Sequence, residues 1–389
     1  MLRLLTLSTL FPDTARPNFG AFVERQTLAL AARADVELQI VSPVGLPPWP
    51  LSRHPHYSAR ARLPIKETWK GLVLHRPRFH AWPGMNEGRA GRSLAKSVLP
   101  LLRSIHERFP FDAIQAEFFW PDGVAAMHLS RALGVPFTVR ARGSDIHYWA
   151  RREATKPQIL EASLAAGRIL AVSGALRGDM ISLGMDPDKI HVCYTGVDLA
   201  MFRPGEREAA KAKLGVSGPL ALSVGALIEL KGHDLLLDAL TRLPGLTLFI
   251  AGDGPERGRL EAKANRLELA ERVRFLGNRP HDELPALMAA SDLLLHASRA
   301  EGLANVWIEA LASGTPVVTA DVGGARELLE GSGAGRAVPR TPEAIADAAR
   351  ELIEARIDPA TARKVAERFS WEANSAALHA HLSEISRAA

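Results

Sequence analysis

The sequence SRAEGLANVWIEALASGTPVVTADVGG, residues 298–324, carries two glutamates eight positions apart, Glu301 and Glu309. Gly302 follows the first glutamate and gives the backbone freedom to turn. The apolar pattern of Asn305–Ser313 predicts a helix. A glycine ends that helix, and a β-branched strand follows it. One glutamate is therefore expected on the loop before the helix, and the other about a turn into the helix.

The backbone between the two glutamates is suited to bind phosphate. A helix start has N–H groups without helical partners and carries the positive end of the helix dipole. The amides expected to lie against a diphosphate are those of Gly302, Leu303, Ala304, Asn305 and Val306. Glu309 suits the paired hydroxyls of a ribose, and Glu301 is placed to meet another part of the same ligand. A nucleotide sugar has that form, whereas spacing alone also allows two solvated surface charges.

The composition is typical of a globular protein. A length of 389 residues predicts two domains, with 47% hydrophobic and 23% charged residues. The apolar start stops at Pro12 and predicts a first strand instead of a signal peptide. No apolar run approaches the roughly 18 residues of a membrane span. The single cysteine, Cys193, excludes an internal disulfide framework and a Cys-cluster metal site, and a cytosolic compartment fits.

Positive charge is concentrated in the first half of the chain. Residues 1–200 hold 25 lysines and arginines against 17 acidic residues, whereas the remainder holds 23 against 26. The first half is therefore the part that would face an anionic partner. Residues 51–109 alone hold 12 basic residues against 3 acidic ones. Two interpretations stay open for the basic helix expected at 91–109: docking on an anionic membrane surface, or a core helix with a solvated basic face.

Strands and helices alternate through both halves, which predicts α/β domains with parallel sheets covered by helices on both faces. The strands expected in the first half are Leu2–Ser8, Val36–Val41, Ala113–Ala116, Phe137–Arg140, Ile169–Val172 and Ile190–Tyr194. Those expected in the second half are Ala221–Val224, Leu246–Ala251, Val273–Leu276, Leu293–His296 and Pro316–Thr319, and the chain is expected to be mostly helical after Arg336–Val338. A turn-rich boundary at 196–219 separates the two sets, and residues 43–70 are expected to form a long excursion.

Helical patterns lie between these strands and after the last one. The expected helices are Phe19–Ala32, Gly91–Phe109, Pro121–Leu133, Glu153–Ala166, Gly174–Leu183, Pro342–Ala355, Pro359–Phe369 and Trp371–Arg387. Pro100 within the second of them predicts a kink or a break.

Ligands of open α/β sheets bind outside the carboxyl ends of the strands. In the first half of this chain, two loops that follow strands are candidates for such binding. Gly20 would let a backbone N–H approach a phosphate, or it belongs to a plain strand-to-helix turn. Arg142, Ser144 and Asp145 form a polar cluster after the strand that ends at Arg140. The alternatives are a local turn cap by Ser144 or Asp145, and an ion pair between Arg140 and Asp145.

Two loops of the second half also follow strands. Lys231 precedes a helix and is a natural point charge for a diphosphate. The glycines of the other loop, Gly252, Gly254 and Gly258, nearly match a dinucleotide fingerprint. The next strand lacks a terminal acid for an adenosine ribose, and ends in Gly277-Asn278-Arg279. A nicotinamide-dependent oxidoreductase is therefore the disfavoured alternative.

The segment EGLANVWIEA, residues 301–310, resembles the E-x7-E motif of the retaining glycosyltransferases of family 4, and the resemblance covers nearly the whole chain. Supporting matches are Pro121-Asp122-Gly123, Arg142-Gly143-Ser144-Asp145, Gly196-Val197-Asp198, Lys231-Gly232, Gly252-Asp253-Gly254-Pro255 and Phe275-Leu276-Gly277. The resemblance implies the GT-B fold, with two facing Rossmann-like domains and a cleft between them. Residues 1–198 would be the acceptor-side domain with helix 371–389 packed back on it, and residues 199–370 the nucleotide-sugar domain.

The resemblance also implies an activity. A hexosyltransferase of this kind moves a sugar from a UDP- or GDP-sugar to a hydroxyl of a glycan, glycolipid or lipid-linked acceptor, with retention at the anomeric carbon. It needs no metal and no cofactor, binds no nucleic acid and serves polysaccharide assembly in the cytoplasm. A peripheral contact with the inner face of the cell membrane through residues 51–109 accompanies this reading.

Site residues follow from the resemblance by position. Glu309 would bind the ribose, Glu301 the donor sugar, and Lys231 the departing diphosphate. Other donor contacts are implied for Gly20, Gly225, Gly252, Gly277, Asn278, Arg279 and the amides of Gly302, Leu303, Ala304, Asn305 and Val306. Lys231, Glu301, Arg142 and Asp145 would be the catalytic set.

The chain departs from the family pattern at three positions. Ala226 stands where many relatives have an arginine for the diphosphate, Arg142 where many have a histidine, and Thr195 where an asparagine is common. These departures leave open how the leaving group is neutralised. The remaining alternative from another functional class is a non-catalytic protein that binds sugar nucleotides.

Overall fold

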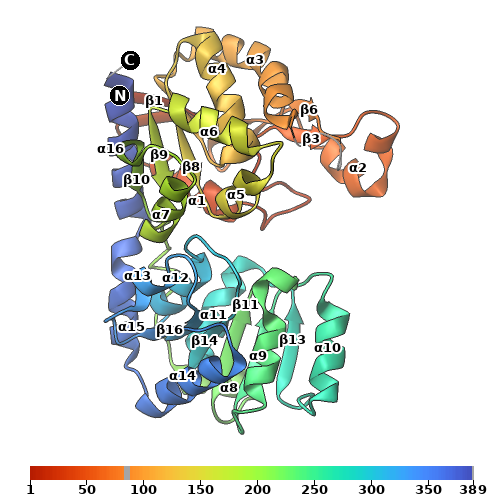
Figure 1. Cartoon of the computed structure of the whole chain (residues 1–389), viewed down its shortest axis with the longest axis vertical. Coiled ribbons are helices and arrows are strands. Elements are labelled where there is room, and N and C mark those ends of the chain that lie inside the picture. Colours follow the sequence, from red (N-terminus) through yellow and green to blue (C-terminus); the bar gives the residue numbers. More distant parts are fainter. Residues whose placement is uncertain (83–87, 388–389) are drawn as a thin grey trace. The chain divides into compact units, whose positions relative to one another are not determined.

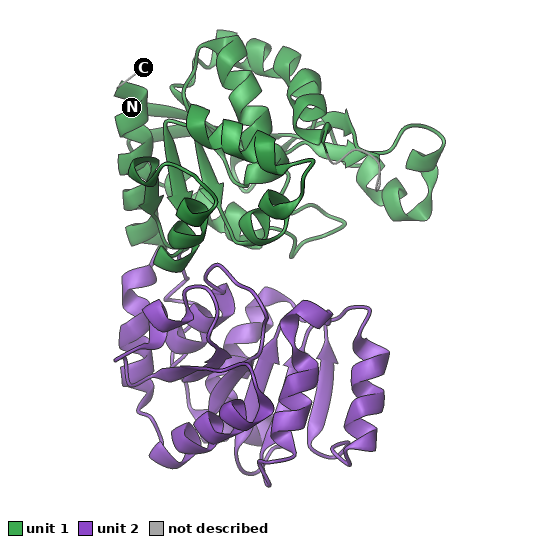
Figure 2. Cartoon of the chain, viewed as in Figure 1, with its two compact units in different colours: residues 1–195, 371–389 green, residues 196–370 purple. Residues whose placement is uncertain are grey.

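The computed structural model describes residues 1–82 and 88–387. The chain forms two compact units, shown in Figure 2. Unit 1 comprises residues 1–195 and 371–389, and unit 2 comprises residues 196–370. Each unit has its own sheet and its own hydrophobic core.

Unit 1 contains an eight-stranded sheet in the order β10-β9-β8-β7-β1-β2-β5-β4. Its strands are β1 (Leu2–Leu7), β2 (Val36–Val41), β4 (Lys66–Trp69), β5 (Leu72–His75), β7 (Ala113–Ala116), β8 (Phe137–Ala141), β9 (Arg168–Ala171) and β10 (Ile190–Val192). All neighbours pair in parallel except β4, which runs antiparallel to β5 at the edge. A separate parallel pair joins β3 (Val44–Leu46) and β6 (Arg78–His80).

Helices cover this sheet, except α2, which extends away from it, as Figure 1 shows. The helices of unit 1 are α1 (Ala21–Ala31), α2 (Pro55–Ala61), α3 (Ala90–Arg108), α4 (Val124–Leu133), α5 (Ser144–His147), α6 (Lys156–Ala165), α7 (Gly174–Ser182) and α16 (Trp371–Arg387). The C-terminal helix α16 packs beside α1 and buries Leu378, Leu382 and Ile385 in the core that β1 and β2 also line. The last helix of the chain thus completes the first unit.

The six strands predicted for the first half are present, each within two residues of its expected ends. Strands β3 to β6 were not expected, because each is only three or four residues long and lies in a stretch rich in proline, histidine and arginine. Residues 43–70 accordingly contain strands as well as α2. Pro100 lies inside one continuous helix, α3, so the expected break is not present. The helix predicted from Pro121 begins at Val124, after a π-helical turn at Phe119–Gly123.

Unit 2 has a fully parallel six-stranded sheet in the order β13-β12-β11-β14-β15-β16. Its strands are β11 (Leu220–Val224), β12 (Thr247–Ala251), β13 (Val273–Gly277), β14 (Leu293–His296), β15 (Val317–Ala320) and β16 (Gly335–Val338). The five predicted strands, β11 to β15, lie within a residue of their expected ends, and β16 is a further strand.

The helices of unit 2 are α8 (Arg207–Lys213), α9 (His233–Leu240), α10 (Arg257–Arg266), α11 (Leu284–Ala290), α12 (Asn305–Ala312), α13 (Ala325–Leu329), α14 (Pro342–Ala355) and α15 (Pro359–Ala366). Leu236, Leu248, Leu293 and Ile345 are among the residues of its core. Because β11 and β14 are neighbours and run in the same direction, the loops that leave their carboxyl ends lie at one edge of the sheet. Lys231 and Glu301 are on those two loops.

Candidate functional site

Lys231 and Glu301 form an ion pair at this edge of unit 2. The Nζ atom of Lys231 lies 2.6 Å from Oε1 of Glu301, and the two side chains are 23% and 13% exposed. The sequence predicted both residues separately, from two motifs 70 positions apart. The structure brings them together, so each neutralises the other.

Gly232 makes this pairing sterically feasible. It follows Lys231 with φ of +68°, a conformation that glycine adopts without strain. A Cβ atom on Gly232 would lie 2.1 Å from the carbonyl oxygen of Ala297, which follows β14. The loop after β11 can therefore approach the loop after β14 only with glycine at this position.

The environment keeps Glu301 ionised. Burial alone raises the pKa of Glu301, but the charge of Lys231 and the hydrogen bonds from Lys231 and Ser298 outweigh it, so the pKa lies below its ordinary value. A carboxylate that is charged and largely buried is a strong hydrogen-bond acceptor. Glu301 can therefore accept hydrogen bonds from sugar hydroxyls once Lys231 is drawn to another partner.

Two buried histidines adjoin the pair and were not predicted as site residues. His296 is the last residue of β14, and its Nε2 lies 3.7 Å from Oε1 of Glu301. His233 opens α9, and its Nδ1 lies 3.3 Å from Oγ of Ser223. Burial lowers the pKa of each histidine to about 4, so both are neutral at pH 7. A histidine at the end of an apolar strand was the only available sequence cue for His296.

The helix α12 carries Glu309 and begins at the predicted phosphate-binding residues. Its N-cap is Ala304, which supplies no side-chain acceptor for the amides of the first turn. Oε1 of Glu309 lies 2.7 Å from Nε2 of His281, and the glutamate side chain is 13% exposed. Neither Glu301 nor Glu309 is thus a solvated surface charge, which was the alternative from spacing alone.

Three predicted donor-binding glycines, Gly225, Gly252 and Gly277, lie at the ends of adjacent strands. The amide of Gly225 donates to Ala251 over 3.0 Å, and that of Gly252 donates to Gly277 over 2.8 Å. A Cβ atom on Gly252 would lie 1.9 Å from the carbonyl oxygen of Gly225. Likewise, a Cβ atom on Gly254 would lie 2.4 Å from the carbonyl oxygen of Leu227. The chain's own packing therefore accounts for Gly252 and Gly254 of the suggested dinucleotide fingerprint, whereas a Cβ atom on Gly258 would meet nothing within 4 Å.

The other predicted residues of this strand end are more exposed. Asn278 and Arg279 are both exposed, and Nε of Arg279 donates to the carbonyl oxygen of Leu276 over 3.1 Å. Nη1 of Arg279 also lies 3.4 Å from Glu283. Ala226 stands next to Gly225, at the position where many relatives have an arginine. Lys231 brings a cation to the same loop after β11.

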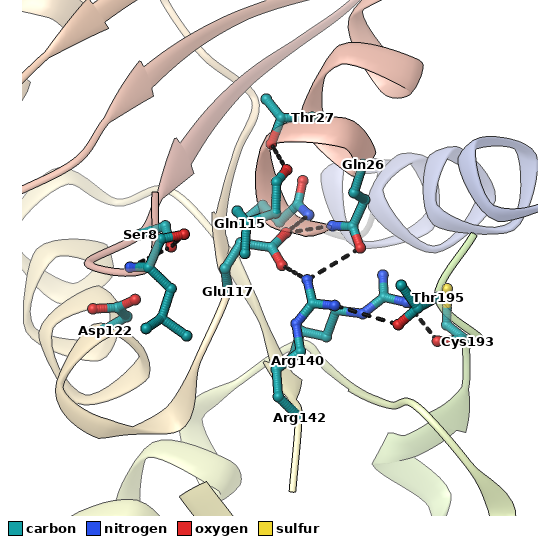
Figure 3. A network of polar contacts seen from close by, with 12 residues as sticks. Ser8, Gln26, Thr27, Gln115, Glu117, Asp122, Arg140, Arg142, Cys193 and Thr195 are labelled. Atoms are coloured by element: carbon teal, nitrogen blue, oxygen red, sulfur yellow. Dashed lines mark hydrogen bonds and ion pairs between the residues drawn. The ribbon is translucent and has the colours of Figure 1, made fainter. Parts of the chain in front are cut away.

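In unit 1, Arg142 is the centre of a buried polar network, drawn in Figure 3. Its Nη2 donates to Glu117 and, over 3.2 Å, to Gln26 of α1. Gln26 and Gln115 in turn donate to Oε1 of Glu117. Burial lowers the pKa of Arg142 to about 10, with the charge of Glu117 opposing that shift, so the guanidinium is charged at pH 7. Sequence reasoning singled out Arg142 but missed Gln26, Gln115 and Glu117, which have no local motif.

Asp145 is fully buried and holds the loop after β8. Its Oδ1 accepts from the amides of Arg142 at 3.0 Å and Gly143 at 2.9 Å, and its Oδ2 accepts from Phe119 at 3.2 Å. Arg140, considered as its ionic partner, instead donates through Nη2 to the carbonyl oxygens of Cys193 and Tyr194. The turn-capping alternative for Asp145 therefore matches its contacts.

Gly20 is also explained in part by the chain's own packing. It is the N-cap of α1 with φ of +69°, and a Cβ atom there would lie 2.5 Å from the carbonyl oxygen of Leu10. Close to that loop, the buried carboxyl of Asp122 accepts from the amide of Thr9 over 2.9 Å. Burial raises the pKa of Asp122 to about 7. These contacts join the loops after β1 and β7.

Two family models match the chain in succession. Residues 23–201 match the model described as Glycosyltransferase Family 4, and residues 206–369 match Glycosyl transferases group 1. The fold and these matches define a GT-B glycosyltransferase, an enzyme class built from two Rossmann-like domains. The chain belongs to glycosyltransferase family 4.

Relatives with known names agree with this assignment. A putative teichuronic acid biosynthesis glycosyltransferase, TuaC, from Bacillus subtilis (strain 168) is 26% identical over 367 residues, which cover 89% of this chain and 88% of the relative. The D-inositol 3-phosphate glycosyltransferase of Mycobacterium tuberculosis (strain F11) is 29% identical over 350 residues, covering 82% of this chain and 72% of the relative.

Solved structures share the fold over the full length. The Anabaena protein Alr3699/HepE, in a complex with UDP, superposes with a TM-score of 0.76 at 23% identity and covers 99% of this chain and 100% of that chain. Sucrose-phosphate synthase from Thermosynechococcus elongatus has a TM-score of 0.80 at 19% identity, with 100% of each chain covered. The same Anabaena protein has also been solved with UDP-glucose.

Proposed function

We propose that the chain is a retaining, metal-independent glycosyltransferase that takes its sugar from a uridine or guanosine diphosphate sugar. The observation that carries this proposal is the Lys231–Glu301 pair beside the start of α12, with Glu309 on that helix. A lysine, a carboxylate and a helix start suit a diphosphate with a hydroxyl-bearing group on each side. The complexes of the Anabaena protein with UDP and UDP-glucose support this class of donor.

The ion pair suggests how the donor is engaged. The diphosphate carries more negative charge than Glu301 and competes with it for Lys231. Once Lys231 turns to the phosphates, the Glu301 carboxylate is free to accept hydrogen bonds from the donor sugar. Glu309 accepts from the ribose hydroxyls, with His281 holding its carboxylate at 2.7 Å. The amides of Gly302–Val306 bind phosphate or sugar oxygens, and Gly277, Asn278 and Arg279 bind near the base.

Catalysis then depends on positioning and on stabilising the diphosphate as it leaves. Lys231 supplies a cation where negative charge develops, and we assign no protein nucleophile. Gly20 and Arg142 belong to unit 1, which we propose binds the acceptor hydroxyl. The buried contacts of Asp145 and Arg142 favour positioning roles for both, with Asp145 shaping the loop that presents Arg142.

A lipid-linked or glycolipid acceptor would bring the enzyme to a membrane surface, and unit 1 offers one surface for it. Among the described residues, no helix is long and apolar enough to cross a bilayer. Helix α3 buries its apolar side chains and exposes its basic ones. In contrast, Trp49, Leu51 and Ile65 are 74%, 49% and 70% exposed. No acidic residue occurs between positions 38 and 66, and the segment around α2 extends from the body of unit 1 in Figure 1.

We propose that this 49–65 surface contacts anionic membrane lipids, with its apolar side chains inserted and its arginines at the headgroups. Cosedimentation with vesicles containing anionic lipid, at low and high salt, tests it. Replacing Trp49 and Leu51 by serine should release the protein, and replacing Arg92 and Lys96 of α3 by serine is the matched control. If the Trp49/Leu51 and Arg92/Lys96 variants lose vesicle binding equally, the 49–65 surface has no special role, and the binding is assigned to the general basic charge of unit 1.

Ligand stabilisation tests the donor class. UDP, GDP, ADP, NAD and NADP are each added during thermal unfolding, because a ligand that binds the native state raises Tm. A uridine or guanosine diphosphate should raise Tm, and the nicotinamide nucleotides should not. A rise with NAD alone would favour the oxidoreductase alternative. Nucleoside diphosphate binding without release of UDP or GDP from any donor sugar would favour a non-catalytic binding protein.

A further inference from the structure

A buried tryptophan and a buried histidine lie behind the Lys231–Glu301 pair, and donor binding as proposed above uses neither. Trp307 is on α12 and His296 ends β14, and they are 0% and 2% exposed. Their rings meet edge to face, with centroids 5.6 Å apart and planes at 80°. Nε1 of Trp307 donates to Nδ1 of His296 over 3.2 Å. A buried indole N–H needs such an acceptor.

This hydrogen bond fixes the proton of His296. Nδ1 accepts from the indole, so in the neutral ring the proton must reside on Nε2. Nε2 points toward Glu301 and lies 3.7 Å from Oε1, the same oxygen that accepts from Lys231 at 2.6 Å. At 3.7 Å the imidazole N–H attracts the carboxylate but does not yet form a hydrogen bond.

The oxygen of Glu301 is thus shared between a near lysine and a more distant imidazole. If the lysine leaves, the buried carboxylate loses its charged donor, which is costly, and that oxygen needs another donor. His296 is the donor already aimed at that oxygen. Hydrogen bonds at reaction sites are often long in the free enzyme and shorten in the complex.

We propose that the Trp307–His296 pair is a positioning relay, in which the Nε2–H of His296 holds the Glu301 carboxylate toward the donor sugar after Lys231 has turned to the diphosphate. The inference rests on the proposed donor site, and extends it by two residues that flank the loop of Glu301, His296 before it and Trp307 after it. His296 and Trp307 touch no substrate in this arrangement. They act only through Glu301.

Two isosteric variants separate this role from simple packing. His296→Asn keeps an acceptor near Nδ1 for Trp307 but removes the donor at Nε2, whereas His296→Gln restores a donor near Nε2. The asparagine variant should lose about five- to tenfold in kcat, the effect of one hydrogen bond, while its KM for the donor stays within twofold. The glutamine variant should recover most of kcat. The relay would be overturned if both variants lost kcat equally and if these losses followed the decreases in their unfolding midpoints.

The tautomer gives a readout that is independent of activity. In ¹⁵N spectra of the intact protein, assigned by loss of one signal set in the asparagine variant, His296 should carry its proton on Nε2 between pH 6 and 8. Adding UDP as the probe should shift that Nε2–H resonance, because Glu301 exchanges Lys231 for His296. Trp307→Phe should abolish the single tautomer. An Nδ1–H tautomer or a charged ring would refute the relay.

These readouts also separate the relay from the enzyme assignment. If no sugar nucleotide is turned over by the wild-type chain, the proposed function fails. The spectra still decide the relay geometry, since a proton on Nε2 that depends on Trp307 supports it. A UDP-induced shift at Nε2 that persists unchanged in Glu301→Ala would contradict the link from His296 to Glu301.

Discussion

Replacing Lys231 with alanine removes the cation that we assign to the diphosphate. In the free chain Nζ of Lys231 lies 2.6 Å from Oε1 of Glu301, and in the donor complex it is expected on the phosphates. Because that cation would stabilise charge developing on the leaving group, its loss should lower kcat by about 10²–10³. A donor KM that rises without a fall in kcat would instead mean uniform binding.

The same substitution should also destabilise the fold, for a reason that the burial of Glu301 supplies. The glutamate side chain is only 13% exposed, so without its lysine it is left as a buried carboxylate lacking its closest charged partner. Such a loss costs about 1–3 kcal/mol in the free energy of unfolding. The Lys263→Ala variant is a matched control, since Lys263 lies 2.6 Å from Asp238 at 19% exposure in the same unit. Because its partner Asp238 is 35% exposed, this variant should lose less stability, and it should retain kcat.

The destabilisation should depend on pH with a definite sign. The pKa of Glu301 is lowered in the folded chain, so its stabilising contribution is complete above its ordinary value of 4.5 and is lost as the pH falls below it. Without Lys231, burial dominates and raises that pKa. The stability difference between wild type and Lys231→Ala should therefore be larger at pH 7 than at pH 4. Urea unfolding at both pH values measures it.

Together, near-normal turnover in Lys231→Ala and a stability difference that does not change with pH would refute the reasoning. Turnover is measured as release of UDP or GDP from the donor sugar. Circular dichroism before the assay ensures that the variant is folded. A loss of turnover equal to that of Lys263→Ala would trace the effect to stability alone.

Three further predictions concern other parts of the chain. Glu309→Ala should weaken UDP or GDP binding by about 1.5–3 kcal/mol, the value of a hydrogen bond to a charged group, and an unchanged Kd by calorimetry would exclude the ribose role. Gly232→Ala should lower the free energy of unfolding in urea by more than about 1 kcal/mol, because the φ of Gly232 is +68° and a Cβ atom there would meet Ala297. Gly258→Ala is the control and should be nearly neutral, because a Cβ atom on Gly258 would meet nothing within 4 Å. Serine at Trp49 and Leu51 should reduce binding to anionic vesicles several-fold without changing turnover of a soluble acceptor, and equal vesicle binding would remove the 49–65 surface from the account.

The sheets of both units were predictable because buried parallel strands form continuous apolar runs. The strand Leu293–His296 was predicted with its exact ends, and Val36–Val41 likewise. The short strands β3 to β6 were missed because they lie in a stretch rich in proline, histidine and arginine, and the edge strand Lys66–Trp69 also alternates exposed polar residues. Local pattern therefore identifies the interior of a sheet better than its edge.

For the site, motif residues were predictable and their partners were not. Lys231 and Glu301 each stand in a recognisable loop, but their direct contact depends on which strands are neighbours. His296 has no motif, and its importance follows from Trp307 eleven positions later. Glycine patterns were ambiguous for a physical reason: Gly252 is required by the carbonyl of Gly225, so the chain's own backbone explains it without any dinucleotide.

The stereochemistry of sugar release tests the central proposal most directly. The wild-type chain is incubated with an α-configured UDP- or GDP-sugar in the presence of EDTA, with water or a simple alcohol as acceptor, and the first-formed sugar product is followed by ¹H NMR. The account predicts the α-anomer first, with a rate that EDTA does not change and that Lys231→Ala lowers by about 10²–10³. A β-anomer as the first product would contradict retention, and no release from any donor would contradict the proposed activity.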